Sequence, residues 1–211
     1  PPHVAAATPL PDLGAGCGEN CAEFFRRGAA SVTGLDISEN MLSVARAEQP
    51  NAVFLRADIC ELPAFDEPFD VVFSSLAVHY VRDFLKLCAD VFSLLTPGGF
   101  FIFSQENPLT TAPSADEIWT RDETGKVLYY NLSEYSVSGK RTIRWFVDGV
   151  VKYHRTFSDI VNALAGAGFV ITAMREPIPS AKELKRDPTL ARKLHKPDFL
   201  VVQARKPLSL H

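Results

Sequence analysis

The chain has 211 residues, of which 46% are hydrophobic and 22% charged, and this fits one globular domain with a substantial core. The formal net charge is −3, and no block of five Lys and Arg residues occurs, which argues against duplex nucleic acid as a partner. No run of 18 uncharged apolar residues is present, so no membrane span is expected.

The four cysteines form no Cys-x-x-Cys pair and no cluster with histidine, so we expect reduced thiols and no metal site. The first residues have neither the basic end nor the long apolar core of a secretory signal, and a cytoplasmic location is expected.

Short apolar runs alternate with helical segments along the chain. We expect strands at 30–36, 52–58, 69–76, 100–106, 169–176 and 198–206, helices at 38–49, 83–95 and 158–168, and a turn at Thr96–Gly99. The strand runs are continuously apolar, which is typical of a parallel sheet covered by helices on both faces.

The residues before Asp12 do not fit this pattern. Pro9 and Pro11 stand where a clean apolar strand is expected, and proline cannot donate to the hydrogen-bond ladder of a central strand. We therefore expect the first strand to be altered or displaced.

A long insert between Asn107 and Thr156 leaves the carboxyl end of strand 100–106, the edge where open α/β sheets bind ligands. Within it, "RTIRWFV-DG-VVKYHRT" predicts a β-hairpin with Asp148-Gly149 as a two-residue type I′ turn. We interpret the insert as a lid over the site. A hairpin packed on the flank of the sheet is the alternative.

The stretch "PDLGAGCGENC" holds three alternate glycines, Gly14, Gly16 and Gly18, behind Asp12. A dinucleotide turn would need a third small residue at position 19, which is Glu19. Acidic residues also end the next two strands, at Asp36 and Asp58. Carboxylates converging on one sheet edge repel a pyrophosphate, but they suit a cationic amine, a ribose diol and an adenine amino group.

Four motifs, "DLGAGCG", "GLDIS", "RADICELP" and "FDVVFSSLAVHY", resemble in order and spacing those of class I S-adenosylmethionine-dependent methyltransferases. The small-molecule group called type 11 or UbiE-like is the most similar, from about Asp12 to Phe103 and more loosely beyond. This resemblance implies a Rossmann-like α/β fold with seven mostly parallel strands, helices on both faces, an antiparallel last strand and a β-hairpin lid after the fifth strand. The whole chain, 1–211, would be one methyltransferase domain with a cofactor-binding half (12–106), a lid insert (107–157) and a C-terminal helix with the last strands (158–211).

The resemblance also assigns roles to residues of the cofactor site. At the methionine end, Asp12 would orient the glycine loop or help to hold the amino group, Gly14, Ala15, Gly16 and Gly18 would form the loop that packs on the methionine and ribose, and Ser74 and Ser75 would line the methionine. Asp36 would accept hydrogen bonds from both ribose hydroxyls. At the adenine end, Ile37 and Met41 would sandwich the ring, and Asp58, with the backbone of Ile59 or Cys60, would accept from the amino group. As alternatives, the strand-end acids cap turns or helices, and Met41 belongs to the core.

Two methyltransferase subclasses are excluded by absent motifs. The enzymes that methylate amino groups of DNA carry a D/N-P-P-Y/F motif after the fourth strand, where this chain reads "SSLA". The cytosine-C5 enzymes need a Pro-Cys nucleophile, and the chain has no Pro-Cys pair. A small-molecule acceptor is therefore expected, together with a monomer or homodimer. Methyl transfer is an in-line displacement for which a protein mainly aligns the groups and excludes water. Candidate acid–base or acceptor-contacting residues are His79, Tyr80, His154 and Arg155.

The predicted hairpin places these last two residues on opposite faces. The expected pairs are Val147 with Val150, Trp145 with Lys152, Arg144 with Tyr153, Ile143 with His154 and Thr142 with Arg155. Only one of His154 and Arg155 then faces the site easily, and an inward Arg155 would favour an anionic acceptor such as a carboxylate. A surface or hairpin-stabilising role is the alternative.

Two other functions compete with methyl transfer. A catalytically degenerate cofactor-binding module with a regulatory or scaffolding role is one, because there is little room before Asp12 for the helical segment with which the family closes over its cofactor. A nucleotide-dependent oxidoreductase is the other, and Glu19 and the acidic edge count against it.

Overall fold

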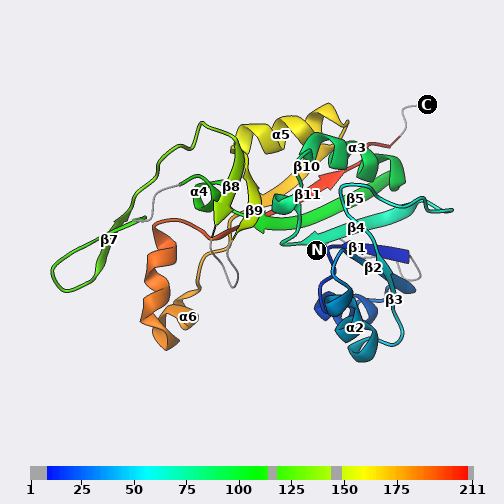
Figure 1. Cartoon of the computed structure of the whole chain (residues 1–211), viewed down its shortest axis with the longest axis horizontal. Helices are drawn as coiled ribbons and strands as arrows, with labels where there is room; N and C mark the ends of the chain where they lie inside the picture. The colour runs from blue at the N-terminus through cyan, green and yellow to red at the C-terminus, as the bar shows by residue number, and fades with distance from the viewer. Residues whose placement is uncertain (1–8, 114–117, 144–148, 209–211) are drawn as a thin grey trace.

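The computed structural model describes residues 9–113, 118–143 and 149–208, and its centre is one seven-stranded sheet with the order β10-β11-β5-β4-β1-β2-β3 (Figure 1). The parallel strands are β1 (Pro9–Leu13), β2 (Ser31–Asp36), β3 (Val53–Arg56), β4 (Phe69–Ser75) and β5 (Leu95–Glu106). The last strand, β11 (Phe199–Arg205), runs antiparallel to both β5 and β10 (Val170–Arg175). The expected Rossmann-like sheet with an antiparallel last strand is confirmed.

Helices cover both faces of this sheet (Figure 1). On one face lie α1 (Glu19–Arg26) and α2 (Glu39–Glu48), and on the other α3 (Phe84–Leu94) and α5 (Phe157–Gly166). Successive side chains of a strand point to opposite faces. Leu10 of β1 therefore belongs to the core under α1 and α2, and Leu13 belongs to the core under α3 and α5.

The expected helices begin where their capping residues predict. Ser38 accepts a hydrogen bond from the Met41 amide at the start of α2, and Asp83 accepts one from the Lys86 amide at the start of α3. At α5, Thr156 and Asp159 form a reciprocal capping box.

The expectation of an altered first strand is wrong, because β1 is a regular central strand with five residue pairs to β2. The carbonyl of Leu13 accepts from the Ser74 hydroxyl of β4, so the odd-numbered residues of β1 direct their backbone groups toward β4. Pro9 and Pro11 therefore remove donors on that side only. The β1–β4 ladder accordingly consists of the single pair Asp12–Phe73, while the ladder to β2 is intact.

The predicted turn at Thr96–Gly99 lies inside β5 as a bulge. Leu95 pairs with Phe69, and the next pair joins Phe100 to Val71, so extra residues of β5 are accommodated between them.

The described residues of the insert after β5 form one short helix and two hairpins, of which only the second hairpin was expected. Its elements are α4 (Pro108–Thr111), β6 (Trp119–Arg121), β7 (Val127–Tyr130), β8 (Gly139–Ile143) and β9 (Val150–His154). Figure 1 shows β7 at the far end of the molecule from α2, and β8 and β9 beside the carboxyl end of β5.

The predicted register of the second hairpin is wrong by four residues. Ile143 pairs with Val150 and Thr142 with Val151, rather than with His154 and Arg155. The predicted partners Arg144, Trp145 and Val147 and the turn residue Asp148 lie outside the described residues. A shift of four keeps the same faces inward, so the alternation of residue types could not reveal it.

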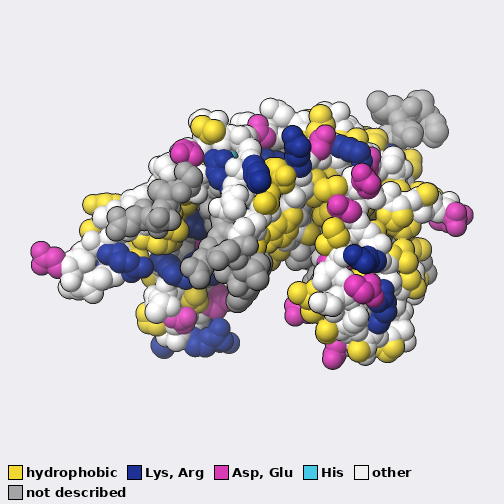
Figure 2. Space-filling model, in the orientation of Figure 1, with side chains coloured by type: hydrophobic (Ala, Val, Ile, Leu, Met, Phe, Trp, Pro, Cys, Tyr) yellow, Lys and Arg dark blue, Asp and Glu magenta, His cyan; other side chains and the backbone are white. Residues whose placement is uncertain are grey.

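Between β10 and β11 the chain forms α6 (Ala181–Arg186) and the 3₁₀ helix η2 (Pro188–Leu194), neither of which was predicted. Ser180 and Glu183 form a capping box at the start of α6, and this sequence signal was available. Lys and Arg side chains gather over α6 on the face in Figure 2, whereas both signs of charge are interspersed elsewhere on that face. Among the described residues, no helix is long and apolar enough to cross a membrane.

We predict that Gly34→Ala lowers the free energy of unfolding by about 1–3 kcal/mol, as overpacked core positions do. A Cβ on Gly34 would lie 2.6 Å from the Phe54 ring and 2.8 Å from the Ala15 Cβ. Urea unfolding measures the loss. Gly166→Ala is the control, because its nearest neighbour, Leu85 Cδ1, would lie at 3.5 Å. Equal stabilities of the two variants would contradict this packing argument.

Candidate functional site

A cavity of about 580 Å³ opens at the carboxyl ends of β1, β2, β3 and β4. Its lining residues come from the loops that follow these strands: Gly14, Gly16, Asp36, Ile37, Ser38, Met41, Ala57, Asp58, Ile59, Cys60, Leu76, Ala77, Tyr80 and Val81. The cavity therefore lies at the edge where the sequence predicts a ligand.

The glycine loop forms the part of the cavity nearest β1. A Cβ on Gly14 would lie 2.3 Å from the Cβ of Ala77, and Gly14 has φ +78°, so only glycine fits here. The amides of Gly14 and Ala15 both donate to the carbonyl of Leu35, which ties the loop to β2. These contacts bring the loops after β1, β2 and β4 into one wall.

Asp36 joins two of these loops through its carboxylate. One oxygen accepts from the Gly16 amide at 2.9 Å, and the other accepts from the Ser38 amide at 2.8 Å. A carboxylate oxygen has more than one lone pair. Asp36 can therefore hold the loops and still accept from a ligand diol.

Beyond Asp36 the cavity becomes apolar and then acidic again. Ile37 is 62% exposed and Met41 46% exposed, and both line the cavity, as a flat aromatic ligand would require. Asp58 accepts from the Cys60 amide at 2.8 Å and also lines the cavity. Met41 contacts the Cys17 sulfur at 3.2 Å, so the side chain is anchored at the rim and is absent from the buried core.

Asp12 is fully buried at the end of β1 and does not line the cavity. Among the described atoms, its Oδ1 has no hydrogen-bond partner, and its Oδ2 accepts only a 3.5 Å bond from Asn20. Burial raises its pKa to about 7, and the negative charge of Asp36 adds to the shift. A cationic ligand group bound near the glycine loop would stabilise the ionised form of this carboxyl.

Of the other residues assigned to the cofactor, four do not line the cavity. Ala15 is buried against the site of Gly34, and a Cβ on Gly18 would lie 2.9 Å from the Phe54 ring, so both serve packing. Ser74 is buried and donates to the Leu13 carbonyl at 2.7 Å, and Ser75 bonds to the Ser104 hydroxyl. In their place Leu76, Ala77, Tyr80 and Val81 complete the wall after β4.

His79 follows β4 in the short 3₁₀ helix η1 (Val78–Tyr80), where it is 3% exposed. Its Nδ1 lacks a hydrogen-bond partner among the described atoms. Burial lowers its pKa to about 4, against the opposing effect of Glu106, so the imidazole is neutral at pH 7. It does not line the cavity.

His154 and Arg155 are both buried, and both line a second cavity of about 750 Å³ beside α3 and α5. His154 bonds through Nδ1 to the Thr111 hydroxyl and through Nε2 to the Tyr135 carbonyl, so both ring nitrogens are engaged by the protein. Arg155 follows the last residue of β9, so strand alternation no longer applies to it. Neither residue lines the cavity at the carboxyl ends of β1 to β4.

A partly buried ion pair between Glu106 and Lys152 was missed in the sequence. Glu106 is the last residue of β5 and Lys152 lies on β9, and the side chain of Lys152 is 7% exposed. This pair ties the insert to the carboxyl end of β5. Burial raises the pKa of Tyr80, and the charge of Glu106 adds to the shift, so the pair lies near the cavity wall. No signal in the sequence paired these residues, which are 46 positions apart.

The described part of the chain contains no group of three or more His, Cys, Asp or Glu side chains that could hold a metal ion. The described cysteines are all free thiols.

Comparison with known proteins agrees with this geometry. A family model described as a methyltransferase domain matches residues 11–103. The S-adenosylmethionine-dependent methyltransferase from Mesorhizobium loti is 40% identical, with a TM-score of 0.89, over 97% of this chain and 93% of that one. An uncharacterized protein of Haemophilus influenzae is 34% identical over 93% of this chain and 80% of its own length. A malonyl-[acyl-carrier protein] O-methyltransferase of Serratia marcescens is 37% identical over 44% of this chain and 36% of its own length.

We predict that Asp12→Asn stabilises the unliganded protein at pH 8 but not at pH 4. The pKa of this carboxyl is about 7 in the folded chain, against the ordinary value of 3.8. Between these values the folded state keeps a proton that the unfolded chain has lost, so the stability contributed by this group is complete below pH 4 and is lost as the pH rises through 7. Removing the charge should recover up to about 4 kcal/mol at pH 8, at roughly 1.4 kcal/mol per pKa unit.

Thermal unfolding at both pH values checks this prediction, with the exposed Asp66→Asn as the control. The same change in melting temperature at pH 4 and pH 8 would show that Asp12 is not a strained carboxylate.

Proposed function

The chain belongs to the S-adenosylmethionine-dependent methyltransferases, and we propose that it transfers the methyl group of S-adenosylmethionine to a small-molecule acceptor by in-line displacement. The observation that carries this proposal is the order of groups at the cavity: a buried acid at Asp12 beneath the glycine loop, and in the lining a loop-bridging acid at Asp36, an apolar pair and a third acid at Asp58. This order matches the amine, diol, aromatic ring and exocyclic amino group of the cofactor.

The residues present fit this cofactor. Asp36 would accept from the ribose hydroxyls, Asp58 from the adenine amino group, and Asp12 would balance the charge of the methionine amine. Ile37 and Met41, which are exposed to the cavity, would be covered by the adenine ring. Because Gly14 lies so close to Ala77, the glycine loop presents backbone and no side chain to the cofactor at position 14.

The bound cofactor supplies a methyl group on a positively charged sulfur, which needs no further activation for displacement. The chain's own task in our proposal is alignment and exclusion of water. Tyr80, Leu76 and Val81 form the wall after β4 that would orient the acceptor. His79 is neutral and buried beside Tyr80, with ring centroids 4.2 Å apart, so we assign it to support of that wall and not to proton transfer.

The acceptor itself is proposed only by class. The described lining of the cofactor cavity contains no Lys or Arg, and Arg155 lines a separate cavity. The Serratia marcescens relative is named for an acyl-carrier-protein acceptor, and carrier-bound and free carboxylic acids therefore belong in an acceptor screen. The lid role of 107–157 and the cytoplasmic location stay predictions from the sequence.

We predict that the protein binds S-adenosylmethionine and S-adenosylhomocysteine, and that Asp36→Asn weakens both by about 10- to 100-fold, the cost of losing hydrogen bonds to a charged group. Isothermal titration calorimetry measures the dissociation constants, with NADH as the negative ligand and Asp66→Asn as the control variant. Full affinity in a folded Asp36→Asn variant would contradict the assignment of the ribose site.

We further predict catalytic turnover. Release of S-adenosylhomocysteine is to be followed against a library of hydroxyl, amine and carboxylic acid acceptors at saturating cofactor. At least one acceptor should raise the rate above the rate of cofactor hydrolysis, and Asp36→Asn should lower kcat/KM for the cofactor. Tight cofactor binding without turnover for any acceptor would instead favour a cofactor-binding module without catalysis.

A further inference from the structure

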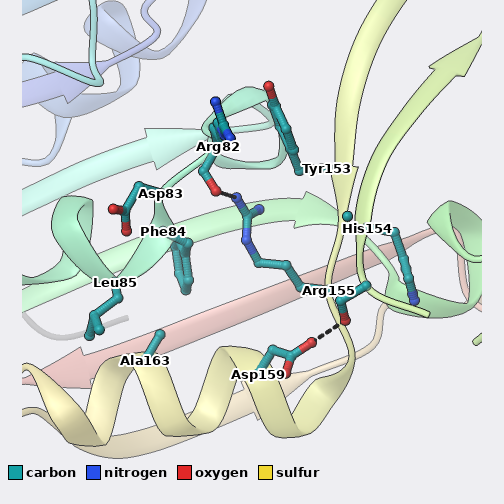
Figure 3. A pocket seen from close by; sticks show the side chains of 11 residues that line it. Arg82, Asp83, Phe84, Leu85, Tyr153, His154, Arg155, Asp159 and Ala163 are labelled. Atoms are coloured by element: carbon teal, nitrogen blue, oxygen red, sulfur yellow. Dashed lines mark hydrogen bonds between the residues drawn. The ribbon is translucent and has the colours of Figure 1, made fainter. Parts of the chain in front are cut away.

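Arg155 lies between β9 and α5 with its guanidinium in the protein interior, 9% exposed. It donates to the backbone carbonyls of Val78 at 3.4 Å and Arg82 at 3.2 Å, and to that of Val81. Figure 3 shows the side chain reaching from the end of β9 past Phe84 to the carbonyl of Arg82. The guanidinium thus spans the whole turn from 78 to 82.

These carbonyls lie at the end of a short helix, where, among the described residues, only the Val78 carbonyl also accepts a backbone amide, that of Val81 at 3.2 Å. Helix η1 ends at Tyr80, and Val78 and Val81 are buried in the core, with exposures of 0% and 1%. Buried carbonyls at a helix end need donors from elsewhere in the protein. Arg155, more than 70 positions away, donates to the carbonyls of the buried Val78 and Val81 and to the carbonyl of the exposed Arg82.

A guanidinium suits this task better than any other side chain. It presents five N–H donors in one plane, whereas an ammonium is a point charge on a flexible stem. The Phe84 ring lies 5.1 Å from the guanidinium carbon, which compensates part of the cost of burying the charge. None of the ion pairs among the described residues includes Arg155.

The turn that Arg155 holds also forms one wall of the cofactor cavity. Tyr80 and Val81 line the cavity, and Val81 is itself one of the three carbonyl partners. We propose that Arg155 is a positioning residue that fixes the backbone of 78–82 and thereby couples the insert, through β9, to the affinity of the cofactor site. The proposal rests on the cofactor assignment above and requires no contact between Arg155 and the acceptor.

The test compares Arg155 with Arg141, a second arginine that holds backbone carbonyls. Arg141 lies on β8, its side chain is 11% exposed, and it donates to the carbonyls of Ala112 and Val137 inside the insert. Both arginines are replaced by Lys and by Ala. The dissociation constant of S-adenosylhomocysteine is measured by calorimetry well below the melting temperature of each variant, so that every sample is folded.

We expect all four variants to lose thermal stability, but only those at Arg155 to lose affinity for S-adenosylhomocysteine, by about tenfold, a size typical of coupling through packed elements. Guanidinium chloride at millimolar concentration should restore affinity to Arg155→Ala, whereas ammonium chloride should not. Arg155→Lys keeps the charge without the planar donors and should remain weak, with or without added guanidinium.

Unchanged affinity in folded Arg155→Lys would overturn the proposal, and so would equal losses at Arg141 and Arg155. If Arg155→Ala does not fold, the lysine variant carries the comparison. Absence of binding by the unaltered protein would overturn the cofactor assignment itself, which separates that failure from a failure of the role of Arg155.

Discussion

The carboxylate of Asp36 organises the site, because it accepts the amides of Gly16 and Ser38 from two different loops at once. Together with the bonds from the Gly14 and Ala15 amides to the Leu35 carbonyl, that bridge holds a glycine loop with three positive φ angles against the entropy of an unrestrained turn. The bridge also places a negative charge at the centre of the cavity. Structural support and the capacity to accept from a diol therefore reside in one side chain.

Charge placement around this bridge carries a cost that a ligand can offset. Asp12 is buried close enough to Asp36 for the two charges to repel, and Asp12 Oδ1 has no partner among the described atoms. A cationic sulfonium and amine would relieve that repulsion, whereas a pyrophosphate would increase it. The same acids that destabilise the unliganded fold thus account for the choice of cofactor.

The insert is attached to the cofactor half through buried polar contacts. Lys152 pairs with Glu106 at the end of β5, and Arg155 holds the turn after β4. Both residues lie within four positions of each other at the end of β9. One short segment therefore contacts both the end of β5 and the turn after β4. Buried charged contacts are sensitive to geometry. A displacement of the insert would therefore change the position of the backbone at Tyr80 and Val81.

The sequence by itself determined the sheet, its helices and most of the cavity, because these depend on local signals: apolar runs, capping residues, alternate glycines and acids at strand ends. Only the tertiary structure decided the rest. The side of β1 that its prolines face depends on strand order, and the hairpin register depends on a shift that residue alternation cannot detect. The partners of Ser74, His154 and Arg155 come from segments 19 to 77 residues distant. Residue type predicts that a buried donor must find an acceptor, but only the folded chain brings a particular acceptor within reach.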